Sequence, residues 1–149
     1  MSTQLKTSLW EEPPKMNCGA PMPAVLTTEL DLYFAYIISG LGEERYAVVK
    51  FHSPMQHIFG YPNDEAFGGH PLSNLNIQHY AFNVIDNSPY INELSQRNSV
   101  CFPGTNYNFK HWLVPLHDET LEVICDKASY IGEFSANSAT EALVECINT

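Results

Sequence analysis

Positive charge is scarce in this chain. Of its 149 residues only seven are Lys or Arg, against seventeen Asp or Glu, and the formal net charge is −10. The seven cations are scattered without a run: Lys6, Lys15, Arg45, Lys50, Arg97, Lys110 and Lys127. Binding to a nucleic-acid backbone or to an anionic membrane surface needs clustered cations. We therefore expect no nucleic-acid partner and no membrane partner.

Several motifs of well-defined chemistry are also absent. The sequence contains no GxGxxG, P-loop, GxSxG or HExxH pattern, so dinucleotide oxidoreduction, ATP hydrolysis and zincin proteolysis have no support. The four cysteines form no CxxC pair, which argues against a zinc knuckle or a thioredoxin-type site. The sequence leaves any cofactor unknown.

Long apolar segments are missing as well. The longest strongly apolar run, Leu32 to Ile38, is far too short to span a membrane. The first residues, MSTQLKTSLWEEPP, contain no apolar segment of the kind found in signal peptides. We therefore expect a cytoplasmic protein whose cysteines are free thiols.

What is present suits one small domain. Hydrophobic residues make up 44% of the chain, enough for a core that buries roughly two-thirds of the unfolded chain's surface. Residues 1–24 are rich in proline and predict an extended, flexible N-terminal arm, followed by a single domain over residues 25–149. Trp10, in the arm, either packs on this domain or crosses onto a partner subunit.

Alternating apolar residues predict strands in the first half of the domain. Leu26–Ile38 and Tyr46–Phe51 each alternate with a period of two, and the short link with Gly40 and Gly42 joins them as an antiparallel hairpin. A third strand is predicted over Ile77–Ile85. One face of the first strand is apolar: Leu30, Leu32, Phe34, Tyr36 and Ile38.

A second hairpin is predicted over Phe109–Ile131. With Asp118 and Glu119 at the turn, three apolar pairs share one face: Leu116 with Leu121, Val114 with Val123, and Trp112 with Cys125. A four-residue turn of the same parity is an equal alternative. Pro115 donates no ladder hydrogen bond, which favours an edge strand or a bulge for this segment.

Two short helices complete the predicted fold. Asn87 or Ser88 offers an N-cap before Pro89, and the helix runs to about Asn98. The capping-box pattern Ser138-Ala-Thr-Glu141 begins the second helix, which has one apolar stripe. We therefore predict an α+β fold: an antiparallel sheet of about five strands, two short helices and the flexible arm.

The segment from His52 to Leu72 indicates where a site could lie. It is predicted to be irregular, and irregular loops of this length in compact domains are usually functional or mobile. Its polar side chains are His52, His57, Asn63, Asp64, Glu65 and His70. They suit a small polar ligand or a transition metal, although their spacing matches no metal motif. The alternative is that they only hydrogen-bond the backbone of an irregular loop.

The predicted hairpin tip is a second candidate. His117 and Glu122 lie on either side of the turn, and a histidine beside a carboxylate can act as a general base near neutral pH. If the tip folds beside the central loop, both side chains face the histidines there. The alternative is a solvated turn.

Three functions remain open on this basis. The first is a module that binds a small polar ligand through the central loop, helped by the hairpin tip. The second is a protein-interaction or homodimeric module without catalysis. The third is a hydrolase that uses Cys101, the one cysteine placed in a loop outside the expected core, or a histidine–carboxylate pair.

The chain also resembles a group of small uncharacterised bacterial proteins. The resemblance rests on FGYPNDEAFGGHPL, the strand ending at Asn83, SPYINELSQRNSV and LHDETLEVIC, and it covers about half of the chain, from Val48 to Cys125. It implies a single small domain and no particular activity.

Overall fold

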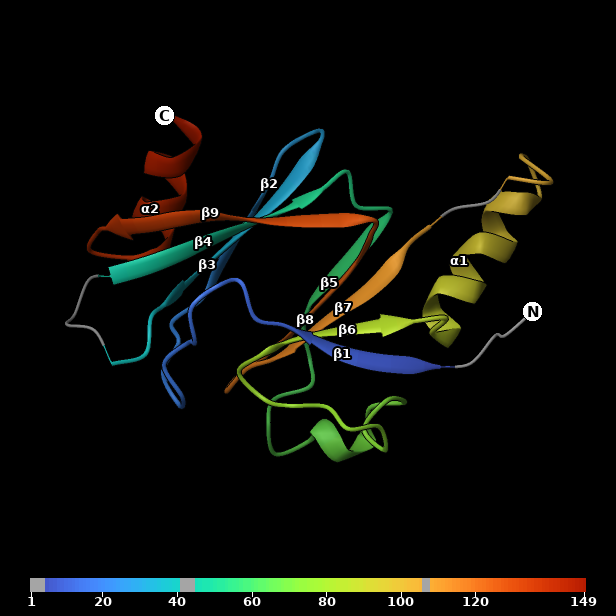
Figure 1. Ribbon diagram of the computed structural model, residues 1–149, viewed down its shortest axis with the longest axis horizontal. Helices are drawn as coiled ribbons and strands as arrows, with labels where there is room; N and C mark the ends of the chain where they lie inside the picture. The colour runs from blue at the N-terminus through green and yellow to red at the C-terminus, as the bar shows by residue number, and fades with distance from the viewer. Residues whose placement is uncertain (1–4, 41–44, 106–107) are drawn as a thin grey trace.

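The predicted α+β class is confirmed. A computed structural model describes residues 5–40, 45–105 and 108–149, and these residues form nine strands in two antiparallel sheets, with two α-helices (Figure 1). The sheets are packed face to face, so the fold has two strand layers rather than the single sheet of about five strands that the sequence predicts. All four cysteines are free thiols.

Each sheet is a simple antiparallel ladder. The five-stranded sheet has the order β1 (Lys6–Trp10), β6 (Phe82–Asp86), β7 (Lys110–Pro115), β8 (Thr120–Cys125) and β5 (Gln56–Gly60). The four-stranded sheet has the order β2 (Ala24–Thr27), β3 (Asp31–Ile37), β4 (Arg45–His52) and β9 (Lys127–Ser135). Because side chains alternate along a strand, each sheet presents one face to the other and one face outward.

The main core lies between the two sheets. It is formed by inward-facing apolar side chains of both sheets, among them Phe34, Phe51, Trp112 and Val123. Trp112 is 5% exposed and touches residues of both layers: its ring lies edge-on to Phe51 and to Trp10, with centroids 5.7 and 5.3 Å apart. These contacts lock the two sheets together.

Helix α2 (Ala139–Ile147) covers the outer face of the four-stranded sheet. Ser138 is its N-cap, and the serine side chain accepts a hydrogen bond from the Glu141 backbone N–H at 3.1 Å, as the capping pattern predicts. The helix buries Ala142, Leu143 and Cys146 on the sheet. The sequence pattern places Ile147 in the same apolar stripe, but its side chain is 40% exposed.

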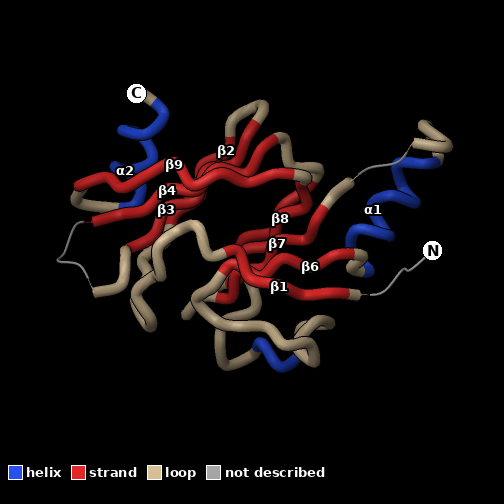
Figure 2. The backbone as a smooth tube through the Cα atoms, in the orientation of Figure 1, coloured by secondary structure: helices blue, strands red, loops and turns tan. Residues whose placement is uncertain are grey.

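Two separate segments of the chain cover the outer face of the five-stranded sheet (Figure 2). Helix α1 (Pro89–Ser99), N-capped by Ser88, packs through Ile91 and Leu94 on Ile124. The loop that follows β5 contains the 3₁₀-helix η1 (Phe67–Gly69) and packs through a different apolar cluster on β6 and β7. These two covers flank the site described below.

The predictions for the first three strands are corrected in two places and confirmed in one. The segment Leu26–Ile38 forms two strands, β2 and β3, because Thr28 Oγ1 accepts hydrogen bonds from two backbone N–H groups of a tight turn, and Leu30 is therefore 68% exposed. The third predicted strand begins at Phe82 rather than at Ile77. The hairpin β3–β4 is confirmed, although Gly42 in its link lies outside the described residues.

The second hairpin has the predicted faces but a different register. Val114 lies opposite Leu121 rather than Val123, and the Leu116 N–H donates to the Glu119 carbonyl, so His117 is one of the two central turn residues. A shift of two residues leaves every side chain on its predicted face. Pro115 ends β7, which is a central strand, so of the two alternatives predicted, an edge strand or a bulge, the edge strand is wrong.

The predicted N-terminal arm contributes a strand. Residues 6–10 form β1, which pairs with β6 at one edge of the five-stranded sheet. Trp10 packs within its own chain, edge-on to Phe82 with ring centroids 5.4 Å apart. Of the two alternatives for Trp10, packing on the domain is the one confirmed.

Candidate functional site

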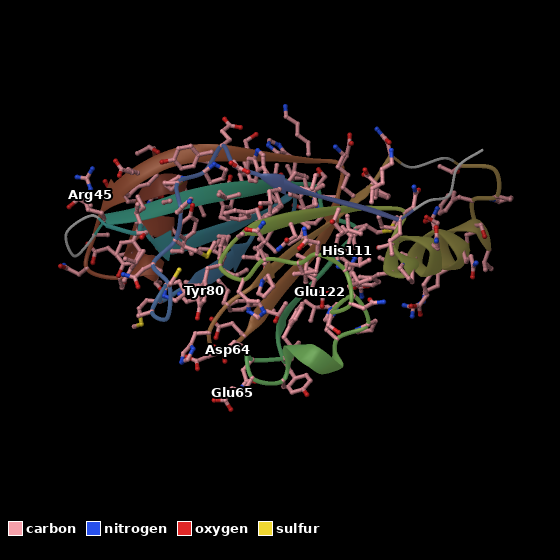
Figure 3. All side chains as sticks on the ribbon, turned by 60° about the horizontal axis from the view of Figure 1, so that its bottom comes forward. Arg45, Asp64, Glu65, Tyr80, His111 and Glu122 are labelled. Atoms are coloured by element: carbon pink, nitrogen blue, oxygen red, sulfur yellow. The ribbon has the colours of Figure 1, made fainter. Side chains whose placement is uncertain are left out.

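Three buried side chains meet on the outer face of the five-stranded sheet. Glu122, on β8, lies between two histidines: its Oε1 is 2.8 Å from Nε2 of His111 on β7, and its Oε2 is 3.0 Å from Nε2 of His70 in the central loop. The ladder pairs Leu113 with Glu122 and His111 with Ile124, so His111 and Glu122 are diagonal neighbours on one face. Figure 3 shows both between α1 and the loop that contains η1.

Hydrogen bonds fix how these groups are protonated. The Leu72 backbone N–H donates to His70 Nδ1 at 3.0 Å, so the proton of a neutral His70 is on Nε2, which donates to Glu122. Ser88 Oγ accepts from the Ile91 N–H and lies 2.9 Å from His111 Nδ1, where the serine hydroxyl can donate its own proton to a neutral ring. His111 then donates from Nε2 to the carboxylate. The arrangement fits an ionised glutamate between two neutral imidazoles.

Glu122 is held in its charged form although it is buried. Its side chain is 9% exposed, and burial alone raises the pKa of a carboxyl group. The hydrogen bonds from His111 and His70, together with the electrostatic attraction of the two rings, outweigh burial and lower the pKa of Glu122 to about 2. The outer face of the sheet therefore holds a buried negative charge at neutral pH.

Aromatic contacts hold both imidazole rings in place. Phe67 stacks on His70 with ring centroids 5.1 Å apart and an interplanar angle of 10°. Tyr90 lies edge-on to His111 at 5.5 Å, and the Tyr90 hydroxyl donates to Gln56 Oε1 at 2.6 Å. Burial raises the pKa of Tyr90, and the nearby Glu122 charge raises it further. The phenol is therefore neutral near pH 7.

The three residues form the floor of a cleft. The cleft lies between α1 and the central loop and has a volume of about 480 Å³. Most of its walls are apolar or aromatic: Ile58, Tyr61, Pro62, Pro71, Leu72, Pro89 and Tyr90. Glu93 and Gly69 complete the lining, and none of the described residues that line the cleft is a lysine or an arginine.

The same geometry argues against hydrolysis by a serine nucleophile and against metal binding at this site. Ser88, His111 and Glu122 are linked in series like a hydrolase triad, but Ser88 is 0% exposed and its oxygen caps α1, so it cannot meet a substrate. Both nitrogens of each imidazole are already hydrogen-bonded. In the described parts of the chain, no group of three or more His, Cys, Asp or Glu side chains is arranged to hold a metal ion.

Two residues singled out from the sequence, His70 and Glu122, lie together in the cleft. His57 does not: it is exposed on β5, a strand inside the segment predicted to be irregular, and its neighbour Ile58 is the one that lines the cleft. His52 lies in the other sheet, where its Nε2 is 2.8 Å from Ser129 Oγ on β9. Burial lowers the pKa of His52, and the charges of Lys50 and Lys127 lower it further. The predicted histidines therefore do not converge as a group.

The other predicted residues form a small surface cluster. The hairpin tip does fold beside the central loop: His117 Nδ1 lies 2.9 Å from Asp64 Oδ2, and the Asp64 N–H donates to the His117 carbonyl. Asn63 Oδ1 accepts from the Ala66 N–H and closes a turn, whereas Glu65 is exposed at the outer side of the loop (Figure 3). This cluster fastens the loop to the sheet, and His117 does not face Glu122.

His117 is expected to titrate at a higher pH than an ordinary histidine. The hydrogen bond that His117 donates to Asp64 raises the pKa of His117 above 6.5, with further contributions from the Asp64 and Asp118 charges. A raised pKa in the folded state means that the stabilisation from this pair is fully present below the ordinary pKa and is lost as the pH rises through the raised one. An NMR titration of the imidazole should show this midpoint.

The substitution Asp64→Asn should return the His117 midpoint toward 6.5. Glu65→Gln is the matched control, because Glu65 makes the smallest contribution to the shift. An unchanged midpoint in Asp64→Asn contradicts the assigned pair.

The sequence interpretation missed His111 and Tyr90. A usable signal existed, since the alternation of the second hairpin already places residue 111 on the same face as residue 122. Tyr90 opens the predicted helix, and nothing in its pattern indicates the direction of that helix. Of the cysteines, Cys125 and Cys146 are buried as predicted, and burial raises the pKa of Cys125 to about 12. Cys101 is exposed after α1.

The chain matches no protein-family model, no curated protein and no solved structure. The resemblance to small bacterial proteins, the cytoplasmic location and the homodimer thus stay predictions. Neither helix in the described residues is long and apolar enough to cross a membrane.

Proposed function

We propose that this protein binds a small organic molecule in the cleft above His70, Glu122 and His111. The volume of about 480 Å³ is within the range of ligand sites, which are typically mostly apolar with a few polar groups that orient the ligand. The observation that supports this most is the floor: a buried carboxylate, held by two hydrogen-bonded imidazoles, lies at the base of an apolar cleft. Because these groups are already hydrogen-bonded to one another, we propose a binding role for them.

Preorganisation is the physical argument for a binding role. His70 and His111 are each fixed by two hydrogen bonds and one aromatic contact, so neither ring needs to be ordered when a ligand arrives. Among the described residues, every buried side-chain nitrogen or oxygen has a hydrogen-bond partner. Rigid, satisfied groups reduce the entropy lost on binding.

The proposal can be tested by an NMR screen with aromatic and aliphatic fragments that have an alcohol, amide or amine end. Fragments should shift the resonances of His70, His111 and Tyr90. Gly69→Trp should abolish these shifts, because Gly69 lines the cleft and a side chain added there meets open space. Gly68→Trp is the matched control: it is equally unhindered, has no left-handed backbone and does not line the cleft.

Two results contradict the proposal. One is that no fragment moves the resonances of the three residues. The other is that the shifts persist in Gly69→Trp as they do in Gly68→Trp, which places the binding somewhere else.

A further inference from the structure

We propose that the ligand is an organic cation, with an ammonium or amidinium group on an apolar body. The inference deepens the proposed function and rests on it. The cationic end lies against the Glu122 carboxylate, and the apolar body lies along the walls formed by Ile58, Leu72 and Tyr90.

The balance of charge in the cleft supports a cation. His70 Nδ1 accepts from a backbone N–H and His111 Nδ1 can accept from Ser88, and with both rings neutral the charge of Glu122 has no positive partner among the described lining residues. Glu93 also lines the cleft, but it is paired with Arg97 one helical turn away on α1. The uncompensated charge is therefore the buried one on the floor, where a ligand's charge interacts most strongly.

The balance of hydrogen-bond donors and acceptors on the floor of the cleft also favours a cationic ligand. Each oxygen of Glu122 accepts one imidazole N–H, and a carboxylate has about four lone-pair sites, so the group can accept further bonds. The Nε2–H groups of His70 and His111 are both directed to that carboxylate and are not offered to a ligand. The floor therefore accepts hydrogen bonds and repels an anion, and a charged donor binds it more strongly than a neutral one.

The aromatic walls and the whole-chain charge favour the same ligand. Tyr90 and Tyr61 line the cleft, and the face of a phenol ring attracts a cation. Tyr61 is 80% exposed, so its ring is available at the mouth. The net charge of −10 raises the local concentration of small cations and their rate of encounter.

Three probes have nearly the same shape but differ in charge: benzylamine, benzyl alcohol and benzoate. They separate the effect of the ligand's charge from that of its apolar body. Each is titrated into the full chain near neutral pH, and the dissociation constant is followed from the His111 and Tyr90 resonances. We expect benzylamine to bind at least about tenfold more tightly than benzyl alcohol. Benzoate should show no saturable binding, and added salt should weaken benzylamine more than benzyl alcohol.

Variants check that the probes occupy the cleft and sense Glu122. Gly69→Trp should abolish benzylamine binding and Gly68→Trp should leave it unchanged. Glu122→Gln, where circular dichroism shows it folded, should bring benzylamine to the affinity of benzyl alcohol. If this variant does not fold, the comparison of the three probes on the wild-type chain decides the matter alone.

The outcomes separate the two proposals. If benzyl alcohol or benzoate binds in the cleft as tightly as benzylamine, the cation is wrong and the small-molecule site stands. If none of the three binds, the cation is again overturned. If the fragment screen also gives no shifts at His70, His111 and Tyr90, the binding site itself is removed.

Discussion

Glu122→Gln is expected to lower the free energy of unfolding by about 3 kcal/mol at pH 7. The amide can accept from only one of the two imidazole N–H groups, and its own NH₂ must then face the other. His70 cannot relieve this by moving its proton, because its Nδ1 already accepts from the Leu72 N–H. If the NH₂ faces His70, one buried donor is left facing another, which costs about 1–3 kcal/mol in itself. If it faces His111, that ring must move its proton to Nδ1 and the Ser88 hydroxyl must accept instead of donate, and in both cases the charge-assisted hydrogen bonds of the carboxylate are lost.

Urea denaturation measures this loss as a lower midpoint with an unchanged m-value. Glu93→Gln is the control, because it neutralises a second glutamate that lines the cleft. Its ion pair with Arg97 is exposed, so the control should change stability by less than about 1 kcal/mol. Equal midpoints for Glu122→Gln and the wild type contradict the assigned network.

Protonation of Glu122 is expected to lower the stability of the fold at acid pH. Its pKa falls from 4.5 to about 2 on folding, so the stabilisation is fully present above pH 4.5 and is lost as the pH falls toward 2. The difference between wild type and Glu122→Gln should therefore shrink across this window. A constant difference from pH 6 to pH 2 (about four units of pH, well beyond the window) contradicts an ionised Glu122.

Trp112→Ala is expected to have the other large effect, a loss of about 3–5 kcal/mol. The indole is 5% exposed and lies between the two sheets, edge-on to Phe51 of one and Trp10 of the other. Its Nε1–H also donates to the Cys125 carbonyl at 3.2 Å. Removing the ring leaves a cavity at the contact that joins the layers.

Thermal and urea unfolding of Trp112→Ala, Phe51→Ala and the double variant should give a coupling energy above about 0.5 kcal/mol, since the two rings touch. Leu30→Ala, in an exposed turn, is the control and should fall within about 0.5 kcal/mol of wild type. Strictly additive losses for the pair contradict the proposed lock between the sheets.

The sequence predicted the fold best where a single local rule, such as helix capping or the alternation of side chains along a strand, determines the structure. The N-caps at Ser88 and Ser138 both hold, because each serine oxygen takes a backbone N–H at the start of its helix. The face of every residue in the β7–β8 hairpin was also predictable, because a period of two determines it. The register was not, since a slip of two residues gives the same faces. The break at Thr28 depends on a side-chain cap that the alternation hides.

The candidate site was only half predictable, for a spatial reason. His52, His57 and His70 are near in sequence, but the chain between them forms part of β4, a turn and β5, which carries them to different places. β5 itself is mostly exposed and lacks a clear alternation, so it resembles a loop. His111 and Glu122 are eleven residues apart and meet only through the ladder.

On β7 and β8, the side chains of neighbouring residues face opposite sides of the sheet and have different roles. Trp112 and Val123 face the sandwich, whereas His111 and Glu122, one residue earlier in each strand, face the cleft. Mutational drift at the outward positions can therefore change what the cleft accepts while the inter-sheet contacts stay as they are. A designer could use this separation to give one stable scaffold a series of different specificities.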